Sequence, residues 1–254
     1  MESLFLAPAL PSELLWFIIH SCTFPTTLII CSTRTDFLTS LITQEQAEPR
    51  YLQQQTEVLA AAPLYQVAVA RHIRIVFIPT VSHLRAYLSV FSADDSKVPP
   101  PPPTSATIPH NNIKQSEQGA VKHPLLIIYG FLSLHRDTSE WSVQGLNNTS
   151  SIFVETAQRI GFQAVIIEPK TSPATTTNDS TNEEVNQAAK HYKVPPDDLS
   201  EPVPILSGSA RRVGPVGGLE ESGSWAGRTV DVRRVLGRWF RFQTTLPYVR
   251  EGRG

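Results

Sequence analysis

The chain has 254 residues, which is enough for one packed domain with appendages and too short for two full domains. Only 41% of the residues are hydrophobic and 21 are proline, so part of the length does not belong to a core. The net charge is −1, and the two cysteines are too few for a zinc site. No run of about 18 to 20 apolar residues occurs, so we expect no membrane-spanning helix and no membrane partner.

The N-terminal segment contains neither a basic region nor a clear small-residue cleavage site. We therefore expect an intracellular protein that is not secreted. Cys22 and Cys31 lie on either side of apolar sequence. We expect them to be buried free thiols rather than a disulfide, because reducing compartments keep thiols unpaired.

The first third of the sequence alternates between strand-like and helix-like segments. Residues 26–31 are rich in Ile and Thr, and apolar residues at helical spacing follow over 34–41. A mostly helical stretch over 51–70 precedes a second buried strand over 73–78, and Ser82 is predicted to cap the next helix. These β-α steps form the first part of a core, which we place at residues 1–96.

The middle of the sequence contains a linker and the rest of the core. Residues 97–122 include five consecutive prolines and few apolar side chains, which predicts a stiff linker or surface insertion. The apolar run within 124–130 is typical of a strand buried on both faces of a parallel sheet. A helix over 147–160, a helix-ending Gly161 and a strand over 162–168 complete the second part of the core, at 123–169.

The C-terminal part divides into a polar stretch and a terminal element. Residues 170–224 are poor in large apolar groups, and we expect a disordered insertion there. Residues 225–254 hold the terminal core element and a tail. The apolar spacing over 229–243 predicts a short strand that runs into an amphipathic helix, with an all-strand interpretation as the alternative.

Strands that alternate with helices indicate an α/β protein. Parallel neighbours need crossover connections, so a mostly parallel sheet with helices on both faces is predicted, interrupted by disordered insertions.

Nucleotide chemistry is not supported by the motifs. None of the 13 glycines is followed by lysine, so no Gly-x-x-x-x-Gly-Lys-Ser/Thr phosphate loop is present. Tyr129 ends the central strand, where a P-loop nucleotidase carries the carboxylate that orders magnesium. We therefore expect an α/β nucleotidase scaffold that has no catalytic residues and no cofactor. Such a scaffold acts by binding other molecules rather than by catalysing a reaction.

Other candidate catalytic or metal groups are weak. Ser133, His135 and Asp137 follow the central strand but lack the Gly-x-Ser-x-Gly turn of a hydrolase triad. Ligand contact at this position is the remaining option, since α/β ligands bind past the carboxyl ends of strands. The seven histidines show no metal-ligand spacing, so no metal site is predicted.

Arginine is concentrated near the C-terminus. Residues 205–254 contain nine arginines, no lysine and four acidic residues, a local charge of +5, whereas residues 1–204 carry −6. The predicted nucleic-acid-binding residues are Arg233, Arg234, Arg238 and Arg241. With Trp239 and Phe240 between them, they suit a phosphate backbone plus base stacking. The alternative is that both aromatics are core and the arginines are a solvated helix face.

The order of elements resembles the RecA-like, P-loop-type fold of recombinase paralogues, particularly the degenerate ATPase-like subunits of Shu-type complexes that assist homologous recombination. The stretches that carry the resemblance are 26–41, 73–88, 124–168 and 235–242. The resemblance implies a nuclear pseudo-ATPase that acts in DNA repair by pairing with a second subunit and by binding single-stranded DNA or a recombinase filament. Similar subunits occur in the Elongator accessory ring, where the target is transfer RNA.

Three hypotheses remain open at this point. The first is a non-catalytic RecA-like accessory subunit in homologous recombination or DNA repair, with an Elongator-like accessory subunit as its variant. The second is an atypical nucleotidase with a phosphate site near 27–35 or 129–137. The third is an interaction scaffold unconnected with nucleic acid.

Overall fold

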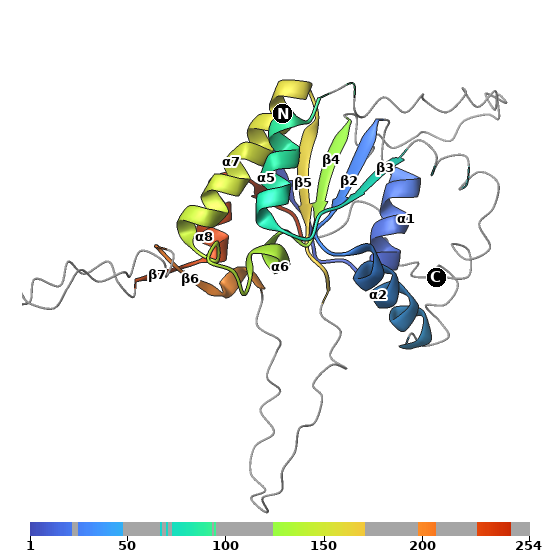
Figure 1. Cartoon of the computed structure of the whole chain (residues 1–254), viewed down its shortest axis with the longest axis horizontal. Coiled ribbons are helices and arrows are strands. Elements are labelled where there is room, and N and C mark those ends of the chain that lie inside the picture. Colours follow the sequence, from blue (N-terminus) through green and yellow to red (C-terminus); the bar gives the residue numbers. More distant parts are fainter. Residues whose placement is uncertain are drawn as a thin grey trace, which may run out of the picture.

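The computed structural model describes residues 1–21, 25–47, 67, 70, 73–92, 94, 124–170, 198–206 and 228–244. Over these residues the chain is an α/β fold, with a six-stranded sheet flanked by helices on both faces (Figure 1). This confirms the predicted mostly parallel sheet between two helical layers.

The sheet is parallel at every pairing between neighbouring described strands. Its strands are β1 (Leu4–Phe5), β2 (Thr26–Ile30), β3 (Ile73–Phe77), β4 (Leu125–Tyr129), β5 (Gln163–Ile167) and β8 (Arg241–Phe242). Their order across the sheet is β3-β2-β4-β5-β1-β8. β2 and β4 are buried along their whole length, as their continuous apolar runs predict for central strands covered on both faces.

Two separate cores lie on the two faces of the sheet. One face packs against α1 (Pro11–Ser21) and α2 (Arg34–Ala47). The other face packs against α5 (Val81–Val90), α6 (Phe131–His135), α7 (Val143–Ile160) and α8 (Val232–Leu236). Figure 1 shows α1 and α2 on one side of the strands and α5 and α7 on the other.

The longest described helix, α7, has well-defined ends. Ser142 caps its N-terminus by accepting a hydrogen bond from the Gly145 N–H at 3.0 Å. Gly161 ends it in the left-handed region, with φ of 75°. Gly145 is required for another reason, because an added Cβ would lie 2.2 Å from the carbonyl oxygen of Glu140.

The N-cap of α5 is Thr80 rather than the predicted Ser82. The Thr80 hydroxyl accepts a hydrogen bond from the His83 N–H at 3.2 Å. Both residues have a hydroxyl, so composition alone did not distinguish them. The apolar face of the helix is as predicted, since Leu84 and Leu88 are fully buried.

Several elements were not predicted from the sequence. They are β1, α1, α6, β8, the short helix η2 (Asp198–Ser200), and β6 (Pro202–Pro204), which pairs antiparallel with β7 (Thr229–Asp231). Residues 198–206 therefore depart from the disordered insertion expected over 170–224, because Val203 is fully buried in the core beneath α8. The linker over 97–122, the rest of that insertion, and the stretch over 51–70 apart from Val67 and Ala70 lie outside the described residues.

No helix in the described ranges is both long enough and apolar enough to cross a membrane.

Candidate functional site

The carboxyl ends of β2 and β4 form the first candidate site. β2 leads into α2 on one face of the sheet, whereas β4 leads into α6 on the other. The connections therefore diverge between these two neighbouring strands. Open α/β sheets bind ligands in the crevice at such a point.

Backbone hydrogen bonds continue past the strand ends at this edge. The Cys31 N–H donates to the Tyr129 carbonyl at 2.9 Å, and the Gly130 N–H donates to the Ile167 carbonyl at 3.0 Å. Gly130 turns with φ of 85°, and an added Cβ would lie 3.7 Å from Cγ of Pro169. These two amide groups are thus bonded within the protein, and a Cβ at Gly130 would make only ordinary contacts with its neighbours.

Glu168 fills the position of an anion at the start of α6. Its side chain is 1% exposed, and its Oε1 accepts a hydrogen bond from the Leu132 N–H at 2.8 Å. The first turn of a helix has unpaired N–H groups and attracts negative charge. A carboxylate of the protein itself therefore accepts the hydrogen bond of this N–H, and its charge would repel an external phosphate at this point.

Tyr129 and Cys31 are unreactive groups at this edge. The Tyr129 hydroxyl donates to the Ala9 carbonyl at 2.9 Å, and burial, reinforced by Glu168, raises its pKa. Burial and Glu168 also raise the pKa of the free Cys31 thiol. Both groups therefore stay protonated near neutral pH and supply no anionic nucleophile. The expected buried free thiol is confirmed for Cys31, while Cys22 lies outside the described residues.

Ser133, His135 and Asp137 do not converge. Ser133 and Asp137 are exposed, whereas His135 is fully buried. The His135 Nδ1 lies 2.7 Å from the Phe131 carbonyl, and its Nε2 lies 3.0 Å from the Thr149 hydroxyl. Burial lowers its pKa to about 4, so the ring is neutral and joins α6 to α7 rather than acting on a ligand.

The four predicted arginines do not lie on one helix. α8 ends at Leu236, and the chain then turns into β8, where the Arg241 N–H donates to the Ser3 carbonyl at 2.9 Å. Pairing of β8 with β1 therefore prevails over the helical spacing of the sequence. The amphipathic helix predicted over 229–243 would have placed Arg234, Arg238 and Arg241 on one face, and this part of the prediction is wrong because the helix ends at Leu236.

Two of these arginines already have partners. Arg241 pairs with Glu2 at 3.2 Å, and the guanidinium of Arg233 lies 5.1 Å from the ring centre of Phe242. Arg234 and Arg238 remain together, and no acidic group in the described part of the chain pairs with either.

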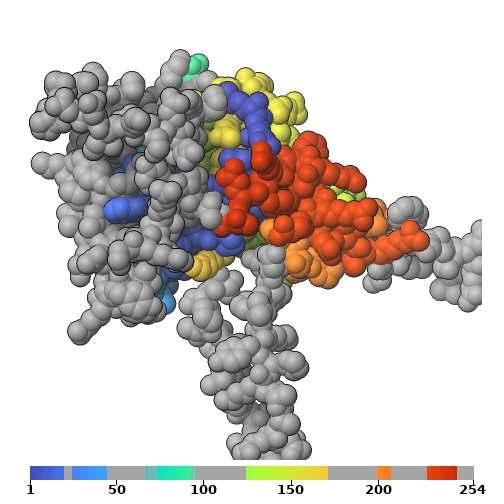
Figure 2. All heavy atoms as spheres, turned by 180° about the vertical axis from the view of Figure 1, so that it is seen from behind, coloured from blue at the N-terminus to red at the C-terminus, as the bar shows by residue number. Residues whose placement is uncertain are grey.

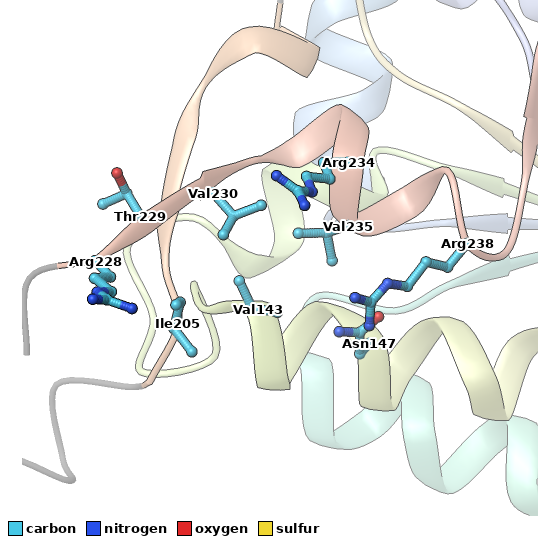
Figure 3. Close-up of a pocket in the computed structure, with 9 residues that line it drawn as sticks. All are labelled: Val143, Asn147, Ile205, Arg228, Thr229, Val230, Arg234, Val235 and Arg238. Atoms are coloured by element: carbon cyan, nitrogen blue, oxygen red, sulfur yellow. The ribbon is translucent and has the colours of Figure 1, made fainter. Parts of the chain in front are cut away.

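Arg234 and Arg238 line a pocket of about 520 Å³ between α7 and the segment from β7 through α8 (Figure 3). We call it the arginine pocket. Its lining residues are Val143, Asn147, Ile205, Arg228, Thr229, Val230, Arg234, Val235 and Arg238. Four aliphatic side chains thus accompany three arginines, and no carboxylate is present among them. Such a lining favours a ligand that combines an anionic group with an apolar one.

The wall of the pocket is held by two aromatic residues. Phe240 is 3% exposed and stacks on Phe153 of α7, with ring centres 6.1 Å apart. The Trp239 Nε1 donates to Asn147 Oδ1 at 2.9 Å. Phe240 is therefore core, as the alternative interpretation held, and offers no face for a base to stack on.

Part of this site was missed in the sequence. Asn147 was treated only as a helix residue, Val143 lay before the predicted start of that helix at 147, and Ile205 fell in the expected insertion. Their convergence depends on β6 pairing with β7, which no local pattern indicates. Glu168 had a usable signal, since it is a carboxylate directly after a buried strand.

Within the described ranges, no group of three or more His, Cys, Asp or Glu side chains is placed to hold a metal ion. Comparisons of the chain with protein-family models, with curated proteins and with solved structures find no match.

Proposed function

We infer that this chain is a non-catalytic RecA-like accessory subunit, which assists homologous recombination or DNA repair by binding a second protein subunit. The observation that supports this most is the buried Glu168 carboxylate at the start of α6, 2.8 Å from the Leu132 N–H. Its negative charge at the start of this helix disfavours the binding of a nucleotide phosphate there. A scaffold of this class without a phosphate site acts through the surfaces that it presents to other molecules.

The pathway and the nuclear location rest on the resemblance of 26–41, 73–88, 124–168 and 235–242 to recombinase paralogues. An Elongator-type accessory ring is the alternative assembly, with the same absence of a phosphate loop. Single-stranded DNA is a second candidate ligand, favoured by Arg234 and Arg238, whose guanidinium groups suit phosphate.

The atypical nucleotidase has less support at both of its candidate segments. In 27–35, Thr27 is fully buried, and the Thr33 hydroxyl donates to Asp36 at 2.6 Å. In 129–137, the backbone donors at Gly130 and Leu132 are already bonded. Phosphate recognition would require these groups to exchange their present partners.

Recovery of the tagged full chain from its own cells, with identification of what copurifies, tests the proposal. We expect a second subunit in near-equal amount, and a repair protein, an Elongator subunit or neither are three distinct outcomes. The purified chain should show no magnesium-dependent ATP hydrolysis. Sustained hydrolysis that Glu168→Ala or Gly130→Val alters in rate would replace the proposal with the nucleotidase.

A further inference from the structure

A second pocket, of about 470 Å³, adjoins the arginine pocket along α7. Its lining residues are Met1, Glu2, Ser3, Ser151, Val154, Glu155, Gln158, Arg238 and Trp239. Arg238 lines both pockets, so the two hollows share a wall. Figure 2 shows N-terminal residues beside the C-terminal segment on this side of the molecule, as the pairing of β1 with β8 requires.

The two pockets follow one face of α7. Val143, Asn147, Ser151, Glu155 and Gln158 recur at intervals of three or four residues, which places them along a single stripe of the helix. From the first to the last, the stripe is about 22 Å long at about 1.5 Å per residue. We call this stripe with its two pockets the α7 groove.

The α7 groove has opposite charges at its two ends. At one end, Arg228, Arg234 and Arg238 line the arginine pocket without any carboxylate. At the other end, the second pocket is lined by Glu2, Glu155 and Met1, which carries the amino group of the chain, so Glu155 supplies the negative charge there. Glu2 is bound to Arg241, whereas Glu155 has no ion-pair partner among the described residues. A ligand that fills the groove is therefore matched best by a negative group at one end and a positive group at the other.

We propose that the α7 groove binds an extended segment of the partner protein, with an acidic residue next to an aliphatic one in the arginine pocket and a basic residue at the Glu155 end. This proposal rests on the proposed function and names the surface and the chemistry of its partner. About seven residues in extended conformation, at about 3.3 Å each, span the groove. The aliphatic side chain packs on Val143, Val230 and Val235, while the carboxylate meets Arg234 and Arg238.

Single-stranded DNA fits the same groove less well. A nucleic acid carries negative charge at every phosphate, so its continuation past Arg238 would meet Glu2 and Glu155. Base stacking is also limited, because Phe240 is buried and Trp239 is partly buried with its Nε1 bonded to Asn147. The arginine pocket alone suits a phosphate, but the groove as a whole suits a peptide of mixed charge.

A selection with a random dodecapeptide display library on the immobilised full chain tests the proposal. We expect enriched peptides to contain Asp or Glu beside Leu, Ile or Val, with Lys or Arg four to seven residues away. Fluorescence anisotropy of labelled synthetic versions then gives Kd for wild type and variants. Arg238→Glu should weaken binding at least tenfold, and Glu155→Lys should weaken it less.

Two controls make these effects specific to the groove. Arg34→Glu is the matched charge reversal, since Arg34 is an exposed arginine on α2 at the opposite face of the sheet, and it should leave Kd unchanged. A peptide with lysine in place of its acidic residue should bind Arg238→Glu more tightly than the original peptide does, and it should not gain affinity for the wild type. Thermal unfolding of each variant confirms that the exposed substitutions leave the fold intact.

Several results would overturn the proposal. The library could enrich no peptide, or the enriched peptides could lack acidic residues. The peptides could also bind Arg238→Glu with the same Kd as the wild type. Displacement of the peptides by oligo-dT, with affinity that depends on Arg238, would assign the groove to nucleic acid. A homodimer that Arg238→Glu dissociates would assign it to a second copy. The two proposals fail on different results. The proposed function is wrong if no second subunit copurifies with the wild-type chain. The groove proposal is wrong if a second subunit copurifies with Arg238→Glu as well as with the wild type.

Discussion

The carboxyl edge of the sheet and the α7 groove differ in how their polar groups are satisfied. At the edge, Glu168 is buried and bonded to the Leu132 N–H, and the Gly130 N–H is bonded to a neighbouring strand. In the groove, Arg234 and Arg238 are exposed and pair with no acidic group in the described ranges. Polar groups bonded inside a protein contribute to its fold, whereas exposed unpaired charges contribute little to stability and are available to a partner.

The wall of the groove should be the costliest part of either region to disturb. Phe240→Ala removes a ring that is 3% exposed and stacked on Phe153, and this leaves a cavity between α7 and the turn after α8. We expect a loss of about 3–5 kcal/mol in the free energy of unfolding, measured by urea denaturation. Trp239→Phe, which loses one hydrogen bond to Asn147, should cost about 1 kcal/mol. Equal losses would show that the two rings are buried alike.

The fold was largely predictable because its central strands can be recognised from short stretches of the sequence alone. β2, β4 and β5 are short apolar runs, so composition and spacing locate them. The end of α7 at Gly161 was predicted, whereas its N-cap Ser142 was not, and the helix begins at Val143 rather than at 147. β1 and β8 have two residues each and exist only through pairing with distant segments. A two-residue strand carries no periodicity, so no reading of the sequence could find it.

The candidate site was predicted in part for the same reason. The arginine cluster was visible in composition, but its geometry depended on where α8 stops. Gly237, a poor helix former, and the pairing of β8 with β1 end the helix early, and this divides the four arginines among three environments. Asn147 and Ile205 join Arg234 and Arg238 only in the folded chain.

His135 gives a pH test of the link between α6, next to the sheet edge, and α7, under the groove. Its pKa is about 4 in the folded chain and about 6.5 in the unfolded chain, so the unfolded state binds more protons between these values. The contribution of the neutral His135 to the free energy of unfolding is therefore fully present above pH 6.5, and it is lost as the pH decreases towards 4. The loss from this group reaches about 3 kcal/mol, at about 1.4 kcal/mol per pH unit.

The measurement is the free energy of unfolding from pH 7.5 to 4 for the wild type and for His135→Gln. Glutamine does not titrate in this range, so the variant should show a shallower decline even though it starts from a lower stability. Parallel curves for the two proteins would mean that His135 is protonated in the folded state as readily as in the unfolded one.

At the sheet edge, Glu168→Ala should cost about 1–3 kcal/mol, because the Leu132 N–H then lies buried without its acceptor. Glu168→Gln keeps an oxygen in the same place and should cost less. Urea denaturation at neutral pH measures both. If Glu168→Ala stabilised the chain instead, the buried carboxylate would be energetically unfavourable in the free protein. The edge would then be a site where a cation or a hydrogen-bond donor normally binds Glu168.

The smallest expected effect on stability is in the groove itself. Arg234→Ala with Arg238→Ala should change the free energy of unfolding by less than about 0.5 kcal/mol, since both side chains are exposed and unpaired in the described ranges. Arg85→Ala is the contrast on the same face of the sheet, because Arg85 donates to Thr149, Glu140 and the Gly145 carbonyl and should cost about 1–3 kcal/mol. A double variant as destabilised as Arg85→Ala would mean that Arg234 and Arg238 hold the fold rather than a partner. A stable double variant that no longer binds its partner would separate the two regions cleanly, because the residues needed for binding would then be those that the fold does not need.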